Sequence, residues 1–118
     1  MDGVYSIEAL MKNPISTQAQ PLQEFILDSQ ACTVIFRQYS QGLTRIEFRL
    51  LEQLFLHEGC LVPRLELLQA VWGAKVTVES RTVDSHIARF RRKMRAIGTP
   101  AFVIETVWGL GYRFRWVP

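Results

Sequence analysis

The stretch that decides the fold is SRTVDSHIARFRRKMR, residues 80–95, which combines an apolar stripe with a large excess of positive charge. It holds five arginines and one lysine against a single acid, Asp84, which is expected to pair with Arg81 or Arg113. Its apolar residues recur at alternating intervals of four and three: Val83, Ile87, Phe90, Met94 and then Ile97. This periodicity predicts an amphipathic helix, and the unmixed charge indicates that the helix faces a negatively charged partner.

The predicted helix spans residues 80–97, with Ser80 at its N-cap and Gly98 directly after its end. At about 100° per residue, the face opposite the apolar stripe is centred on Arg81, Ser85, Ala88 and Arg92. Arg89 and Arg95 flank that face. Small residues between long cations suit a helix that approaches another surface closely.

Two further helices are predicted before the basic one. The first, LTRIEFRLLEQLFLHEG (residues 43–59), has Thr44 and Glu47 at the spacing of a capping box, in which each side chain bonds an unpaired backbone amide. Its predicted core face contains Phe48, Leu51, Leu54 and Phe55. The second covers residues 63–72, with a proline in its first turn, and its predicted core side contains Leu65, Leu68 and Trp72.

Short β-rich runs lie on both sides of the three helices. EFILD (24–28) and ACTVIFR (31–37) are separated by a short polar turn and predict a hairpin, which residues 38–42 follow as a further turn. FVIETV and YRFRWV, joined through the glycine-containing turn WGLG, predict a second hairpin over residues 102–117.

Length and composition limit the chain to one domain of ordinary globular character, since it has 118 residues and 48% hydrophobic content. Residues 1–22 are predicted to be a flexible N-terminal segment or linker, because their last part is polar and holds two prolines, and residues 23–118 form the domain. No stretch approaches the roughly 20 apolar residues of a membrane span. Cys32 and Cys60 are too far apart in sequence for a CxxC motif, which favours reduced thiols and a cytoplasmic location.

The order of these elements predicts an α+β fold, a winged helix-turn-helix with an N-terminal antiparallel sheet, three helices and a C-terminal β-hairpin wing. The major groove of DNA is about 12 Å wide and admits one α-helix. A helix of roughly sixteen residues is about 24 Å long, which is enough to cross that groove. The basic helix is therefore expected to bind double-stranded DNA.

Four linked motifs resemble the effector domain of the OmpR/PhoB family of bacterial response regulators, over roughly residues 24–116: LTRIEFRLLEQL, LELLQAVWG, SRTVDSHIARFRRKM and ETVWGLGYRF. The resemblance implies a four-stranded N-terminal sheet and sequence-specific binding to direct repeats in promoters as head-to-tail pairs. It also implies a two-component phosphorelay and contact with RNA polymerase through the loop 73–80. The acidic cluster and phospho-acceptor of a receiver domain are absent from the sequence, which leaves an excised effector domain, a stand-alone regulator and a membrane-anchored relative as alternatives.

By this resemblance the DNA-contacting residues are Arg81, Ser85, His86, Arg89, Arg92, Lys93, Thr106, Trp108 and Arg113. Arg81 and Arg89 are expected to contact bases or phosphates, because a guanidinium group binds guanine or phosphate through two hydrogen bonds. Arg92 and Lys93 are expected at phosphates, and Thr106 at the DNA backbone beneath the wing.

The wing departs from the family pattern at Trp108, where a minor-groove arginine is usual. An indole supplies no charge, so one expectation is that Arg113 or Arg115 makes the minor-groove contact instead. The other is that Trp108 packs on sugars or on a neighbouring subunit. The alternative function is therefore a winged-helix module repurposed for protein–protein interaction, with Trp108 and Trp116 as anchors.

The distribution of charge favours binding to a polyanion, and the residue content argues against catalysis and metal binding. Residues 1–79 carry a net charge of −3 and residues 80–118 carry +6, which predicts one face that attracts a polyanion and one that is repelled by it. Two histidines and two cysteines, none at ligand spacing, supply neither a catalytic set nor a metal site. The sequence thus predicts a protein that is not an enzyme and needs no cofactor.

Overall fold

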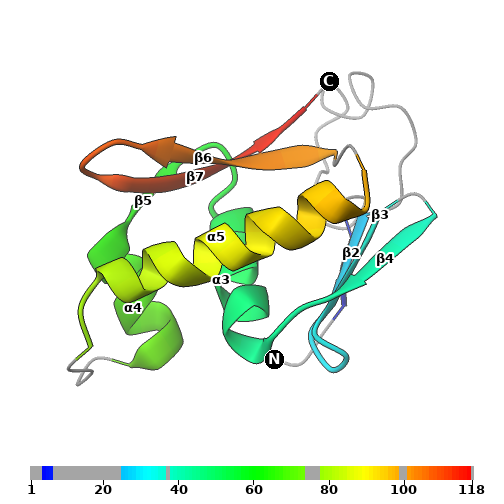
Figure 1. Ribbon diagram of the computed structural model, residues 1–118, viewed down its shortest axis with the longest axis horizontal. Helices are drawn as coiled ribbons and strands as arrows, with labels where there is room; N and C mark the ends of the chain where they lie inside the picture. Colours follow the sequence, from blue (N-terminus) through cyan, green and yellow to red (C-terminus); the bar gives the residue numbers. More distant parts are fainter. Residues whose placement is uncertain (1–3, 7–24, 37, 74–77, 99–100, 118) are drawn as a thin grey trace.

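The computed structural model describes residues 4–6, 25–36, 38–73, 78–98 and 101–117, and in it three helices lie between two antiparallel sheets (Figure 1). The predicted α+β winged helix-turn-helix is confirmed. Among the helices that the structure describes, none has both the length and the apolar character that crossing a bilayer requires.

The N-terminal sheet contains four strands in sequence order: β1 (Val4–Ser6), β2 (Phe25–Asp28), β3 (Thr33–Phe36) and β4 (Tyr39–Gly42). The predicted first hairpin is confirmed, with Phe25 opposite Phe36 and Asp28 opposite Thr33. Its turn is held by the Asp28 carboxylate, which accepts hydrogen bonds from the amides of Gln30 and Ala31 at 3.1 and 3.2 Å.

The two edge strands of this sheet lie outside the predicted strands. The turn predicted at 38–42 is wrong, because Tyr39–Gly42 pair with β3 as an edge strand. The side chains of β4 are mostly exposed, so this strand carries no apolar alternation that a sequence pattern shows. Val4–Ser6, placed in the flexible segment 1–22, form an edge strand on β2, and residues 7–24 with the predicted boundary at residue 23 lie outside the described part of the chain.

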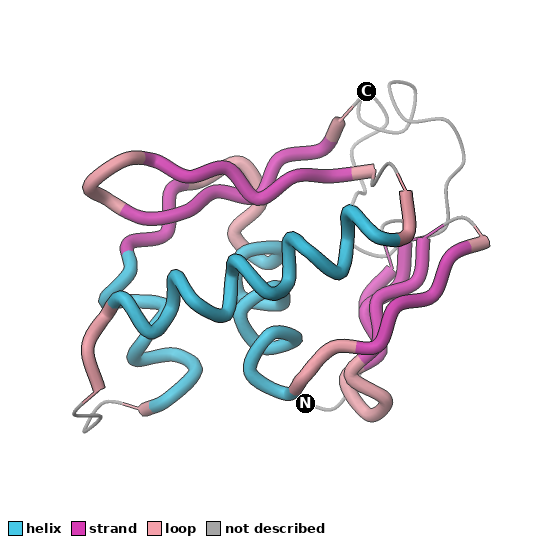
Figure 2. Tube along the Cα trace, viewed as in Figure 1, coloured by secondary structure: helices cyan, strands magenta, loops and turns pink. Residues whose placement is uncertain are grey.

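Helix α3 (Arg45–Leu56) begins with the predicted capping box. The Thr44 hydroxyl accepts from the Glu47 amide at 3.1 Å, and the Glu47 carboxylate accepts from the Thr44 amide at 2.9 Å. The helix occupies the centre of the molecule (Figure 2). Its buried residues are Glu47, Phe48, Leu50, Leu51, Leu54 and Phe55, a wider face than predicted because α4, α5 and β7 all pack against it.

Helix α4 (Arg64–Trp72) buries Leu67, Leu68 and Val71. The prediction that Leu65 faces the core is wrong, since its side chain is 57% exposed, and Trp72 is only half-buried. The side of α4 that is buried is adjacent to the side that was predicted to be buried. The difference arises because both α3 and α5 pack against this short helix. Arg49 of α3 donates to the carbonyls of Val71 and Ala70, at 2.9 and 3.1 Å, and so satisfies two of the unpaired groups at the end of α4.

The C-terminal sheet contains β6 (Phe102–Val107) and β7 (Gly111–Trp116), which form the predicted hairpin over 102–117, and a third strand, β5 (Leu61–Pro63), which pairs with β7. The strand β5 was not predicted, because three residues are too few to show a period. Even-numbered residues of the hairpin, including Ile104 and Phe114, point toward the helices, whereas Glu105 and Arg113 lie on the outer face.

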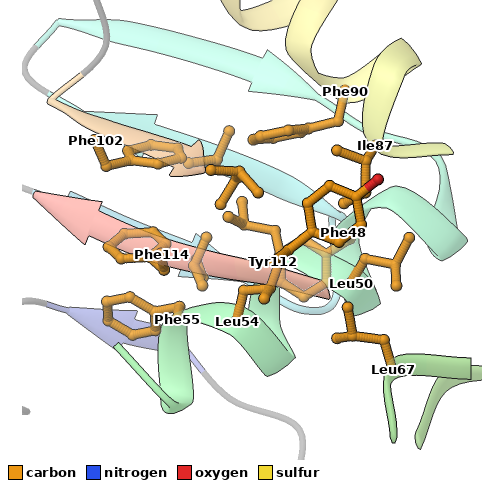
Figure 3. Packing of buried hydrophobic residues seen from close by; sticks show 14 of the residues in the cluster. Phe48, Leu50, Leu54, Phe55, Leu67, Ile87, Phe90, Phe102, Tyr112 and Phe114 are labelled. Carbon is orange, nitrogen blue, oxygen red and sulfur yellow. The ribbon is translucent and has the colours of Figure 1, made fainter. Parts of the chain in front are cut away.

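An aromatic cluster joins the two sheets into one core (Figure 3). The rings of Phe102 and Phe114 stack at 4.9 Å, and Phe25 of the N-terminal sheet meets Phe102 edge-on at 5.3 Å and Trp116 at 4.9 Å. Edge-to-face pairs of this kind add about 0.5–1.5 kcal/mol each to the gain from burial. The hairpin is therefore anchored at its base, where the chain ends.

Candidate nucleic-acid interface

Helix α5 (Arg81–Ala96) has one buried side and one exposed side, as predicted. The buried residues are Val83, Ile87, Phe90 and Met94, and the exposed residues are Arg81, Ser85, Ala88, Arg89, Arg92, Arg95 and Ala96. Ser80 stands at the N-cap as predicted, although its side chain makes no capping hydrogen bond and its backbone is helical. Gly98 adopts the positive φ of 110° that ends a helix.

The cations of the exposed side are available to a ligand. Arg81 donates to Glu79 at 2.8 Å, but both side chains are more than 70% exposed, and such a pair contributes little in water. Within the described part of the chain, no hydrogen bond or ion pair engages the side chains of Arg89 or Arg92. Ser85 and Ala88 lie between these cations and leave the helix surface low at its centre.

His86 lies at the edge of this surface, half-buried against α4. Its ring centroid is 5.6 Å from that of Trp72, and its Nδ1 atom is enclosed with no hydrogen-bond partner among the described residues. Burial lowers the pKa of His86, and the charge of Arg89 lowers it further against an opposing effect of Glu47. The imidazole is therefore mostly neutral at pH 7.

Lys93 does not belong to the exposed surface. Its Nζ atom donates to Glu47 of α3 at 2.6 Å, and the side chain of Glu47 is fully buried. Burial alone raises the pKa of Glu47, but the hydrogen bonds from Lys93 and Thr44 outweigh it and the pKa is lowered. A cation held by a buried carboxylate is not free for a phosphate, which argues against the predicted role of Lys93.

Asp84 pairs with neither of its predicted partners. Its Oδ1 atom accepts from Nε of Arg64 in α4 at 2.8 Å and from the hydroxyl of Tyr112 in β7. Burial raises the pKa of Asp84, but the hydrogen bonds from Arg64 and Tyr112 outweigh this effect and the net shift is downward. The one acid of α5 is thus turned toward its own fold, and its charge is compensated there.

The three wing residues of the predicted site lie in three different environments. Thr106 points toward α5 and accepts from Arg91 at 2.9 Å. Arg113 lies on the outer face of the sheet, where its Nε atom donates to Glu105 at 2.9 Å. Trp108 stands at the tip with 87% of its surface exposed, in a turn closed by the Leu110 amide on the Val107 carbonyl at 2.9 Å.

The structure therefore brings Arg81, Ser85, Arg89 and Arg92 onto one surface, with His86 at its border, and separates Thr106 and Arg113 from each other. The sequence interpretation missed Arg91, which is half-buried between α5 and the hairpin. A signal was present: Arg91 follows Asp84 by seven residues, which places both side chains on the same flank of a helix.

Comparison with known proteins identifies the family to which this domain belongs. The family model described as "Transcriptional regulatory protein, C terminal" matches residues 40–114. The regulatory protein VanRc of Enterococcus gallinarum is 44% identical over 70 residues, which are 59% of this chain and 30% of that protein. The chain spans about half or less of the length of the curated relatives it matches, reaching 51% for the regulator SrrA of Staphylococcus aureus.

Solved structures agree in fold. The DNA-binding domain of Bacillus subtilis CssR has a TM-score of 0.64 and 33% identity, covering 76% of this chain and 98% of that one. The Klebsiella pneumoniae RstA DNA-binding domain, solved in complex with the RstA box, has a TM-score of 0.63 and 28% identity, covering 77% and 90%. The chain is therefore not an enzyme: it belongs to the family of C-terminal domains of transcriptional regulatory proteins, the OmpR/PhoB-type winged-helix effector domains of response regulators.

Proposed function

We propose that this domain binds double-stranded DNA in a sequence-specific manner, with α5 in the major groove and the hairpin 102–117 as a wing over the adjacent minor groove. The observation that carries the proposal is the exposed side of α5, where Arg89 and Arg92 have no partner among the described residues, Arg81 is only weakly paired and Ser85 and Ala88 allow close approach. The similar RstA domain was solved on its DNA box, which supports the same mode for this chain.

The charges support this division of roles. Arg89 and Arg81 are suited to guanine edges or phosphates, and Arg92 to phosphates, because guanidinium groups bind both through paired hydrogen bonds. The engagement of Asp84 by Arg64 removes the one acid of α5 from the approach of a polyanion. His86 adds a neutral donor or acceptor at the border of the surface.

We further propose that two copies bind head to tail on direct repeats in promoters and that the DNA-bound domain contacts RNA polymerase in the cytoplasm, in the output of a two-component phosphorelay. Paired binding raises affinity because the second copy associates at a high effective concentration. The loop 73–80 is the proposed polymerase contact, and its residues 74–77 lie outside the described part of the chain.

A second candidate function is protein–protein interaction through the wing tip. The observation in its favour is the exposure of Trp108, which is joined in the same turn by Leu110 at 57% exposed. An exposed tryptophan beside a leucine is the kind of anchor that protein interfaces use.

Selection from a pool of random duplexes tests both candidates. The DNA-binding proposal expects enrichment of one motif, repeated in the same orientation at a fixed spacing, and weaker binding as salt rises. No enrichment at low salt would contradict it and favour the interaction module.

A further inference from the structure

Two side chains of α5 face the wing rather than the exposed surface. Asp84 and Arg91 are seven residues apart, so they differ by only about 20° around the helix axis and lie two turns apart on one flank. Figure 1 shows the hairpin β6–β7 running along this helix. Both side chains reach that hairpin, and each of them is only partly exposed.

Asp84 holds the strand β7 through Tyr112. The Tyr112 hydroxyl donates to Oδ1 of Asp84, and Arg64 of α4 donates to the same oxygen at 2.8 Å. Tyr112 is only 3% exposed. Burial, followed by the bond to Asp84, raises the pKa of Tyr112 to about 12, so its hydroxyl keeps its proton at neutral pH and always donates.

Arg91 holds both strands of the hairpin at the same level. Its guanidinium donates to the Ile104 carbonyl and, at 2.9 Å, to the Thr106 hydroxyl, both on β6. Its Cζ atom lies 5.5 Å from the ring centroid of Tyr112 on β7, within the range of a cation–π contact. Thr106 and Tyr112 are direct cross-strand partners, so one guanidinium covers a complete pair of the ladder.

The position of this pair matters for the wing tip. The only pair beyond Thr106 and Tyr112 is Val107 with Gly111, after which the turn carrying Trp108 begins. The aromatic core holds the opposite end of the hairpin, and β5 pairs with β7 as far as Gly111, whereas Asp84 and Arg91 join this end of the hairpin to α5. These two residues hold it close to the tip.

We propose that Asp84, Arg91 and Tyr112 are positioning residues that fix the angle between the wing and the exposed side of α5, so that one duplex is bound by both. This proposal rests on the proposed DNA binding, and it adds that the wing and α5 must be held at a fixed angle for both to bind one duplex. None of the three side chains needs to touch the duplex. Their effect is to supply a wing that is already oriented, which reduces the ordering cost of binding.

The chain offers a matched control on the outer face of the same hairpin. Glu105 accepts from Arg113 at 2.9 Å and from Arg115 at 2.6 Å, and these ion pairs join β6 to β7 without reaching a helix. Glu105→Gln therefore weakens polar contacts within the hairpin and leaves its attachment to α5 intact. Tyr112→Phe removes one hydroxyl from that attachment and keeps the ring.

The experiment measures binding of the wild type, Tyr112→Phe, Arg91→Gln and Glu105→Gln to two duplexes. One carries the full selected site, and the other is shortened to remove the flank that the wild-type wing protects in a footprint. Tyr112→Phe and Arg91→Gln are expected to lose about tenfold on the full site, as for one hydrogen bond to a charged group, and little on the shortened site. Glu105→Gln is expected to show no such loss on the full site, because it leaves the attachment to α5 intact and releases Arg113 and Arg115.

Amide hydrogen exchange of the free proteins supplies a readout that does not depend on DNA. We expect faster exchange at the wing tip in the Tyr112→Phe and Arg91→Gln variants, and unchanged exchange in α5. Equal losses on the two duplexes, or unchanged binding and exchange in both variants, would overturn the positioning role. A wild-type protein that binds no duplex would instead contradict the proposed function, while the exchange data would still show whether these residues hold the wing.

Discussion

Lys93 of α5 donates to Glu47 of α3 at 2.6 Å, and Glu47 uses the same oxygen to accept from the Thr44 amide at the start of its own helix. The carboxylate that caps α3 therefore also fixes the C-terminal half of α5. Its second oxygen is buried without a partner among the described residues, so Lys93 supplies the compensating charge. This link makes Lys93 a structural residue.

Replacement of Lys93 by methionine is expected to destabilise the fold and to leave DNA contacts in place. The buried Glu47 would lose its counter-charge, at a cost of about 2–4 kcal/mol in the free energy of unfolding, which is below the usual range of about 3–5 kcal/mol because Lys93 is partly exposed. Urea denaturation measures this loss. Glu47→Gln in the same chain should recover part of this lost stability. A Lys93→Met protein with normal stability and weaker DNA binding would instead support a contact between Lys93 and a DNA phosphate.

The pKa of His86 predicts a dependence of stability on pH. Burial and the charge of Arg89 lower this pKa from 6.5, so the unfolded chain binds a proton at pH values where the folded protein does not. The free energy of unfolding should fall as the pH drops below 6.5, by at most about 1.4 kcal/mol per pH unit, until the folded pKa is reached.

Urea denaturation at several pH values between about 7.5 and 5.5, above the range in which the carboxylates titrate, measures this fall. The variant His86→Gln has no titrating ring and should show a flatter profile. The same fall in both proteins would mean that another group is responsible.

Gly111 is expected to tolerate no side chain. A Cβ atom at this position would lie 2.2 Å from the Val62 carbonyl oxygen and 2.8 Å from the Pro63 Cα atom, both in the backbone of β5. Gly111→Ala should therefore push β5 from β7 and cost about 3 kcal/mol or more. Gly42→Ala is the control, since nothing lies within 4 Å of its added atom, and thermal unfolding of a Gly111→Ala protein near the wild-type temperature would contradict the prediction.

Two arginines on the exposed side of α5 should give different binding defects. Arg89→Ala is expected to weaken the selected site by about 1–3 kcal/mol and to relax the preference at one base position. Arg92→Ala should weaken all sequences alike and reduce the slope of log affinity against log salt by about one. Anisotropy titrations at several salt concentrations separate these outcomes, with Arg45→Ala at the exposed start of α3 as control. Unchanged binding by both variants would contradict the placement of α5 in the major groove.

Replacement of Trp108 by arginine is expected to tighten DNA binding and to steepen its salt dependence, because a cation at the wing tip adds a minor-groove or phosphate contact. The side chain is 87% exposed, so stability should change little. Trp108→Ala serves as the comparison for loss of the indole alone. Weaker binding by the arginine variant would assign the indole a contact of its own, with sugars or with a protein.

The sequence predicted α3, α5 and the final hairpin because each carries a period that burial imposes, and it predicted α4 from the proline at its start and the glycine after its end. The stripe from Val83 to Met94 is the clearest case, and all four of its members are buried. Tyr39–Gly42 and Leu61–Pro63 were missed or misassigned for the opposite reason. They are short strands held by backbone pairing, which leaves no pattern in the side chains.

The exposed surface of α5 was predicted because it depends on helix geometry, whereas the tertiary partners of its side chains were not. The exposure of Arg81, Ser85 and Arg92 follows from the angle of each residue to the apolar stripe. The engagement of Lys93 by Glu47 joins residues 46 positions apart, and the pairing of Asp84 with Arg64 joins residues 20 apart. Such contacts depend on how the helices pack, which the order of residues on one helix does not reveal.

The sixteen residues of α5 divide into a side that packs against the fold and a side that is exposed. Four apolar side chains, together with Asp84, Arg91 and Lys93, contact the rest of the molecule, whereas the side chains at positions 81, 85, 88, 89 and 92 are exposed. If the domain binds DNA as proposed, exchange of those five residues should change the preferred site without a compensating change in the core.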